Sequence, residues 1–462
     1  DGDTSFAPPP RTGNDPATSS RCSAKYKFGE TCRTWTDYLK VQLPDSCIRE
    51  LQAVHHEVNP FALYFDGLDA RGREDEEILL DMVRRQIELC DQCDALQVVY
   101  DMHNGFGGIA DLTLRWAREE VPKAGKIVFA VQPDLGEPTV PTLSPKAAAR
   151  PQLSPDFAWL QESQQEEDAP SSLSLNKEAC ASVSAAFSFA ALLNTEVHAF
   201  VPISVPIWSA KPPLAMPKLR RQCQYETSAL AAVALDNVML PSRLQGGPRP
   251  SRFIGAMAPH HRPTCGVLQA MPLPEAPPHV LCDQPPGFND TLHELAPHLF
   301  DLSSMSAGSM NPYTSVVLRG ATPKRLLNLT CRLPPPARQN SFLHPESMPL
   351  PLPFPQVFGS NISKGGVLAD AFVARKADQD VEACSVITQL HAMAGAGHCG
   401  ALKQMVQAVK THRSSAWASA VRARYGVEAD EFRDVLETVT DHLECSAADD
   451  VDDDDGLSEE EG

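Results

Sequence analysis

The feature that most constrains the fold is an alternation of helical and extended patterns in the first third of the chain. Apolar residues recur at helical spacing from Arg73 and predict an amphipathic helix. An apolar run at 95–100 predicts a buried strand, and a glycine-bearing turn follows at 101–108. A helix at 109–121 then leads to a second strand at 126–131. Strand, helix and strand so close together form a βαβ unit, which predicts a parallel sheet with helices on its faces.

Helical patterns dominate the next clear elements. Residues 176–193 predict a helix rich in alanine and phenylalanine, and 225–240 predict an almost wholly apolar helix that must be buried on most sides. A strand is predicted at 314–319, and terminal helices at 401–409 and 428–445. The fold class is therefore α/β with additional elements after the first sheet.

Composition predicts where ordered blocks end. The chain has 41 prolines, which cluster between the periodic segments and indicate long irregular connections. The predicted parts are a disordered N-terminal segment at 1–33, a Rossmann-type α/β domain at 34–243 with a disordered insertion at 134–172, a second α+β domain at 244–400 with a proline-rich connection at 332–357, C-terminal helices at 401–445 and an acidic tail at 446–462.

The charge of the chain argues against a general affinity for nucleic acid. The formal net charge is −19, and binding to phosphates needs clustered Lys and Arg that the sequence lacks. Nine acidic residues fall in the tail at 446–462. That tail is either solubilising charge or a strip that binds a basic partner.

The cysteines and the apolar segments predict a cytoplasmic location. Thirteen cysteines without a repeating spacing are typical of reduced thiols. Cys90 and Cys93 have the spacing of half a zinc site, but no second pair exists and Cys90 is predicted on the buried face of a helix, so no metal is predicted. The most apolar stretch, 179–193, is too short to span a membrane. Residues 1–33 resemble no targeting peptide, and a chain that begins at Asp1 suggests a truncated start.

Several separated motifs carry a resemblance to a known family. The stretch at 100–133 resembles the nucleotide-loop region of tubulins. A closer resemblance, over roughly 34–445, is to the misato family of divergent tubulin-like proteins. Its motifs are WTDYLKV at 35–41, DMHNGFGG at 101–108, YETSAL at 225–230, ALDNVMLP at 234–241, TSVVLRG at 314–320 and PQVF at 355–358.

The misato resemblance implies a fold and a function. It implies a tubulin-like fold, in which a parallel-sheet domain of the nucleotide-binding type is followed by an α+β domain and C-terminal helices. It also implies a non-enzymatic role in mitochondrial distribution, morphology and fusion, with tubulin, chaperonin or mitochondrial outer-membrane proteins as partners. The expected location is the cytoplasm, with peripheral association to the mitochondrial outer membrane.

The turn at 101–108 is the candidate site. By resemblance, Asn104, Gly105, Gly107 and Gly108 occupy the positions of a phosphate loop. GTP is the cofactor that such a loop would bind. The alternative is a tight strand-to-helix turn that only glycine fits. A phosphate loop needs accessible backbone N–H groups and a hydroxyl, whereas Phe106 is bulky and no hydroxyl follows before Thr113.

Two leading functional hypotheses therefore remain, beside a third in which the chain is a scaffold that uses the proline-rich 332–357 region as a polyproline ligand. The first is a non-enzymatic protein with a degenerate phosphate loop and no cofactor. The second is a GTP-binding GTPase whose first strand is missing from this chain, since residues 1–33 contain no strand followed by a glycine turn. Neither gains a catalytic residue from the sequence, because Asp101 and His103 are better interpreted as caps of the turn than as an acid–base pair.

Overall fold

A computed structural model of the chain defines the helices, the strands and part of the segments that join them. The segments predicted to be disordered at 1–33 and 134–172, the WTDYLKV motif and the acidic run at 449–462 lie outside the described residues. The described residues are 43–51, 61–68, 73–132, 177–195, 197–204, 216–220, 223–257, 265–272, 292–294, 313–320, 338–350, 354–360, 362, 366, 380–392, 399–413 and 416–448.

A parallel sheet of three strands forms the first part of the molecule. Its strands are β1 (Ala95–Asp101), β2 (Gly125–Gln132) and β3 (Ala199–Ser204), in the order β1-β2-β3. Both neighbouring pairs are parallel. The prediction of an α/β protein with a parallel sheet is confirmed.

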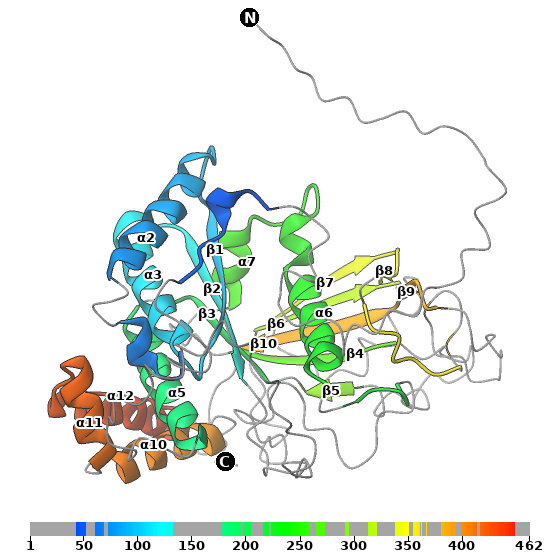
Figure 1. Ribbon diagram of the computed structural model, residues 1–462. Helices are drawn as coiled ribbons and strands as arrows, with labels where there is room; N and C mark the ends of the chain where they lie inside the picture. Colours follow the sequence, from blue (N-terminus) through cyan, green and yellow to red (C-terminus); the bar gives the residue numbers. More distant parts are fainter. Residues whose placement is uncertain are drawn as a thin grey trace, which may run out of the picture.

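Helices connect and cover these strands (Figure 1). The helix before the sheet is α2, the crossovers are α3 and α5, and α6 and α7 follow β3. Their bounds are Arg73–Glu88 for α2, Phe106–Glu120 for α3, Lys177–Asn194 for α5, Gln224–Arg243 for α6 and Pro250–Met257 for α7. Short 3-10 turns at Asp45–Cys47 (η3) and Tyr64–Gly67 (η4) precede α2.

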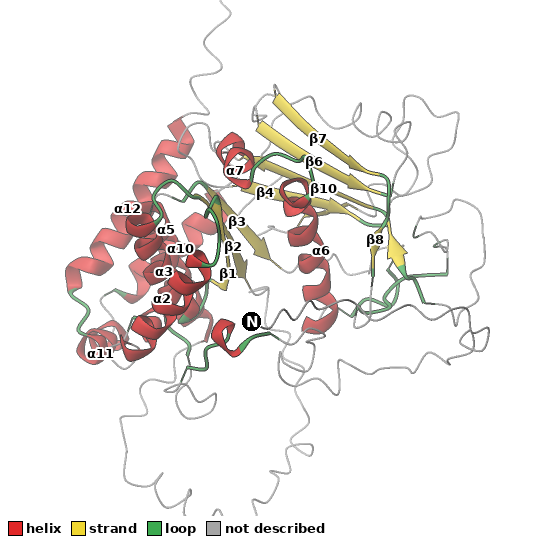
Figure 2. Ribbon diagram, turned by 90° about the horizontal axis from the view of Figure 1, so that it is seen from above, coloured by secondary structure: helices red, strands yellow, loops and turns green. Residues whose placement is uncertain are grey.

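The alternation of side chains along β2 divides the core into two layers. Val128 and Ala130 belong to a buried cluster with α3 and α5, whereas Ile127 and Phe129 belong to a cluster with α6 and α7. Successive side chains of a strand point to opposite faces, so an uninterrupted apolar run supplies both layers. In Figure 2, α6 lies between the first sheet and the second, where most of its residues from Glu226 to Pro241 are buried.

The second sheet has the order β5-β4-β10-β6-β7. Its strands are β4 (Cys265–Ala270), β5 (Leu292–Glu294), β6 (Tyr313–Arg319), β7 (Arg338–His344) and β10 (Val386–Ala392). A small separate sheet pairs β8 (Met348–Pro349) with β9 (Ala383–Cys384). β6 and β7 are parallel, and the other pairs are antiparallel. The strand predicted at 314–319 is confirmed.

The prediction of a proline-rich connection at 332–357 is wrong in part. Strand β7 lies inside this segment and pairs along its whole length with β6. Prolines bound this strand at 334–336 and 349, but the run from Arg338 to His344 contains none, so every residue of it can join the ladder. The prolines on both sides therefore concealed β7, which is an edge strand of the second sheet among the described residues.

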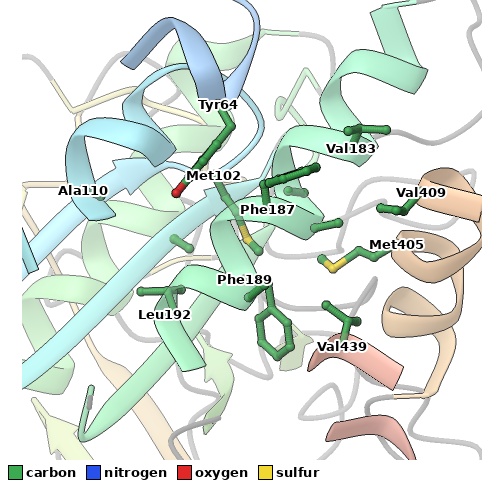
Figure 3. Close-up of a cluster of buried hydrophobic side chains, with 14 of the residues drawn as sticks. Tyr64, Met102, Ala110, Val183, Phe187, Phe189, Leu192, Met405, Val409 and Val439 are labelled. Carbon is green, nitrogen blue, oxygen red and sulfur yellow. The ribbon is translucent and has the colours of Figure 1, made fainter. Parts of the chain in front are cut away.

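Three helices follow the second sheet, and the first and third of them pack against α5. They are α10 (Cys399–His412), α11 (Ala416–Tyr425) and α12 (Ala429–Ala448). Met405, Val409 and Val439 from these helices join the same cluster as Phe187 of α5 and Met102 (Figure 3). The terminal helices thus share a buried cluster with α5 and the first sheet, although they follow the second sheet in sequence.

Candidate functional site

The candidate site is the turn that joins β1 to α3 at the carboxyl end of the parallel sheet. β1 ends at Asp101, and α3 begins at Phe106 rather than at the predicted residue 109. Gly107 and Gly108 therefore lie in the first turn of the helix. Ligands of open parallel sheets bind at this edge, so the turn has the right place in the fold for a nucleotide.

The backbone N–H groups of the turn donate to acceptors of the protein itself. The bonds run from Gly105 to the Phe61 carbonyl (3.3 Å), from Phe106 to Asn104 Oδ1 (2.9 Å), from Gly107 to the Asn104 carbonyl (3.0 Å), and from Gly108 and Ile109 to the Gly105 carbonyl (3.0 and 3.2 Å). A phosphate cradle needs several such groups directed at the anion. Here each of the five has an internal acceptor.

Close packing accounts for the glycines in the helix start. A Cβ atom on Gly108 would lie 2.3 Å from the Tyr64 carbonyl oxygen, and one on Gly107 would lie 3.1 Å from the side chain of Ser188. Neither glycine is among those with a positive φ angle. The absence of a side chain, rather than left-handed backbone geometry, is what these positions require.

The segment that contains Phe61 and η4 covers the turn. A Cβ on Gly105 would lie 2.6 Å from the Phe61 ring, and one on Gly67 would lie 2.1 Å from the Gly105 carbonyl oxygen. The rings of Phe61 and Phe106 meet edge to face with centroids 5.1 Å apart, and 44% of Phe106 remains exposed. The backbone of Gly67 and the rings of Phe61 and Phe106 are therefore packed closely against the turn.

The polar side chains of the turn are also used internally. Besides accepting from Phe106, Asn104 donates to Asp101 Oδ2 at 3.3 Å. The Thr113 hydroxyl, the first after the glycines, donates to the Ile109 carbonyl at 2.9 Å within α3. Asn104 therefore holds the turn through its side chain, with Asp101 as one of its partners, and α3 begins after Gly105 without a side-chain cap.

His103 is part-buried beside this turn. Burial lowers its pKa, although the nearby Asp101 carboxylate and a hydrogen bond with the Val131 backbone act in the opposite direction. Its Nδ1 atom is buried without a hydrogen-bond partner. No hydrogen bond joins His103 to Asp101 among the described contacts, so the pair lacks the geometry of an acid–base couple.

A polar triad, in which Tyr64 and Asp111 are buried and Arg115 is exposed, was not found from the sequence. The Tyr64 hydroxyl donates to Asp111 Oδ2 at 2.6 Å, and Arg115 contacts both carboxylate oxygens of Asp111. Burial and the Asp111 charge raise the pKa of Tyr64 well above its ordinary value. The triad fastens η4 to α3, and Tyr64 stays protonated. Its only sequence signal is Asp111 one turn before Arg115.

The order of the described strands in the first sheet does not reverse. Its strands follow in sequence order, and both crossover helices, α3 and α5, contribute to the same buried cluster. Nucleotide crevices form where the strand order reverses, which would require a strand beyond β1. Among the described residues β1 is an edge strand, and Val99 on it is 51% exposed. The strand predicted at 95–100 is therefore present, but the expectation that it is buried is wrong at Val99.

The cysteine pair does not form a metal site within the described residues. α2 ends at Glu88, so Cys90 lies after the helix and is exposed, contrary to the prediction that it is buried on the helix face. Cys93 is half-buried. No group of three potential ligands occurs among the residues that the structure describes.

Two motifs of the resemblance outside the turn, ALDNVMLP and TSVVLRG, are joined by contacts of α6. Asn237 donates to the Val317 carbonyl at 3.2 Å and to Thr388 Oγ1 at 2.9 Å, and Asp236 pairs with Arg319 at 2.9 Å. These bonds fasten α6 to β6 and β10. The ALDNVMLP and TSVVLRG motifs therefore meet in space at the junction of the two sheets.

The molecule is thus a mixed α/β protein with a parallel three-stranded sheet and a turn rich in glycine at its carboxyl edge. No protein-family model matches the chain. The chain is similar to protein misato homolog 1 of Mus musculus, with 27% identity over 112 residues. That match covers 23% of the chain and about a fifth (20%) of the relative. It supports a misato-like relationship over that stretch.

Proposed function

We propose that this chain is a misato-type, tubulin-like protein that acts by binding protein partners and has no GTPase activity. The observation that carries the proposal is that all five backbone N–H groups from Gly105 to Ile109 already have protein acceptors. The similarity to protein misato homolog 1 adds the family context. Asn104, Gly105, Gly107 and Gly108 then act as a structural turn.

Nucleotide binding would require this turn to be rebuilt. A phosphate could reach the Gly105 N–H only if the bond to Phe61 broke and the two phenylalanine rings separated. Leaving a buried polar group without a partner costs about 1–3 kcal/mol. Such a cost opposes binding at each N–H group that would have to change acceptor, which weighs against the alternative of a GTPase.

Thermal unfolding of the purified chain with GTP or GDP tests this proposal. A ligand at a hundred times its Kd stabilises the folded state by about 2.7 kcal/mol, which would raise the Tm by several degrees. We expect no rise with either nucleotide. A rise that Gly107→Ala abolishes, and that the control Gly255→Ala leaves intact, would establish a nucleotide site instead.

The cellular role that we propose is the one implied by the misato resemblance, in mitochondrial distribution, morphology and fusion. The chain would act by binding tubulin, chaperonin or outer-membrane proteins. In the described part of the chain, no helix is long and apolar enough to cross a membrane. The proposal is peripheral, protein-mediated association with the mitochondrial outer membrane. Alkaline carbonate should release the protein from isolated mitochondria, and a protein that stays in the carbonate-washed pellet would contradict this mode of association.

A further inference from the structure

The turn after β1 contains a chemically labile pair of residues that the proposed function does not use. Asn104 and Gly105 form the one Asn-Gly pair in the sequence. In such a pair the backbone nitrogen of the glycine can attack the side-chain amide carbon of the asparagine, because glycine has no Cβ to hinder the approach. Among the asparagines of the chain, Asn104 is therefore the one whose neighbour most favours spontaneous deamidation.

The reaction needs no reagent other than water. The Gly105 amide loses its proton, and its nitrogen forms a bond to Cγ of Asn104. The bond from Cγ to Nδ2 breaks, and the side-chain nitrogen takes up a proton and leaves as ammonia. Water then opens the cyclic imide at either carbonyl, which leaves aspartate or isoaspartate in place of Asn104.

In the folded turn, hydrogen bonds hold both reacting groups. The Gly105 N–H donates to the Phe61 carbonyl, and Asn104 Nδ2 donates to Asp101 Oδ2. The Phe61 ring also packs on Gly105, where an added Cβ would lie 2.6 Å from it. Attack on Cγ requires the bond to Phe61 to break and the Asn104 side chain to turn away from Asp101. The segment that contains Phe61 therefore controls the reaction.

The two bonds that must break are the longest in the turn. Each measures 3.3 Å, whereas the bonds donated by the N–H groups from Phe106 to Ile109 measure 2.9–3.2 Å. Hydrogen bonds between N–H and oxygen are most often about 2.9–3.0 Å long and weaken beyond that distance. Asn104 is only half-buried, so water reaches its side chain. Opening of such a surface segment takes less free energy than unfolding of the core.

We propose that Asn104 deamidates in the folded protein, at a rate set by local opening of the segment that contains Phe61. The product adds a negative charge beside Asp101 and removes the amide that donates to it. Like charges repel at this separation, so the modified turn holds Phe61 less firmly. This modification site goes beyond the proposed partner-binding function, and its chemistry involves no nucleotide.

The test is peptide mapping by mass spectrometry while the full chain is incubated at mildly alkaline pH. An end-blocked peptide of residues 101–108 gives the rate without the fold. We expect aspartate and isoaspartate at Asn104, formed about tenfold to a hundredfold more slowly than in the peptide, because two hydrogen bonds must open first. Asn194 is the internal control. It is exposed but precedes Thr195, whose branched side chain hinders the attack, so it should stay unmodified.

Replacement of the Phe61 ring should accelerate the reaction in the folded chain. Phe61→Leu keeps most of the apolar volume but loses the edge-to-face contact with Phe106. We expect it to raise the rate at Asn104 about twofold to tenfold, as the loss of one aromatic contact predicts. The matched control is Phe354→Leu, which removes another half-buried ring, stacked on Phe358 in a different cluster. Its rate should equal that of wild type.

Three outcomes would overturn the inference. One is a folded chain that deamidates at Asn104 only after urea unfolds it, which would mean that the turn opens only with the whole fold. Another is equal rates in the folded chain and the peptide, which would mean that the turn restrains neither reacting group. The third is equal acceleration by Phe61→Leu and Phe354→Leu, which would assign the effect to global destabilisation.

Discussion

Gly108 illustrates how one missing atom shapes the turn after β1. A Cβ there would lie 2.3 Å from a backbone oxygen that cannot rotate away, so Gly108→Ala should lower the free energy of unfolding by about 2–3 kcal/mol. Gly107→Ala meets the Ser188 side chain at 3.1 Å and should cost about 1 kcal/mol. Urea unfolding measures both.

Gly255 provides the control for these substitutions. It lies inside α7, and a Cβ there has no heavy atom within 4 Å. Gly255→Ala should therefore be neutral or stabilise the protein by up to about 1 kcal/mol, because alanine favours the helix. Equal losses at Gly108 and Gly255 would contradict the close-packing explanation.

His103 makes stability depend on pH. Because burial lowers its pKa in the folded state, the unfolded chain takes up a proton first as the pH falls below the ordinary value of 6.5. This contribution to stability is present above pH 6.5 and is lost as the pH falls through the lowered native pKa. His103→Asn should therefore lose less stability than wild type between pH 7.5 and 5.5 in urea unfolding. An unchanged pH dependence would contradict the assignment.

At the scale of elements, Asn237 decides how α6 meets the second sheet. It is fully buried and donates to β6 and to Thr388 of β10. Asn237→Ala leaves both acceptors without their donor and should cost about 2–4 kcal/mol in urea unfolding. Ser228→Ala, at an exposed position of the same helix, should change stability by less than about 0.5 kcal/mol. A small effect at Asn237 would mean that apolar packing alone holds the junction.

At the scale of the molecule, the C-terminal helices and α5 share one core. Phe432 of α12 is 2% exposed and packs on Phe187 at 5.0 Å between centroids. Phe432→Ala should cost about 3–5 kcal/mol and raise hydrogen exchange in α5 and α12 together. Arg433→Ala, whose side chain is 64% exposed, is the matched control and should do neither. Faster exchange in α12 alone would show that the terminal helices unfold separately.

Local pattern determined much of the element order before any contact was known. The helix from Arg73, the apolar strand at 126–131, the buried helix at 225–240 and the strand at 314–319 are all present, since periodicity and apolar runs report directly on burial. The pattern was less informative where the burial of a residue depends on which other elements pack against it. Val99 is half-exposed although it lies in an apolar run, on a strand that is at the edge of the sheet among the described residues. β7 lies among prolines, although its own residues can pair.

The sequence by itself determined that a glycine-bearing turn joins a strand to a helix at the edge of a parallel sheet, because glycine and strand patterns are local. Only the tertiary structure decided what those glycines contact. Phe61, Tyr64 and Gly67 come from a separate segment, and Ser188 from α5, so no spacing rule relates them to Gly105 or Gly108. Contacts between distant segments depend on the packing of whole elements, and local sequence does not encode that packing.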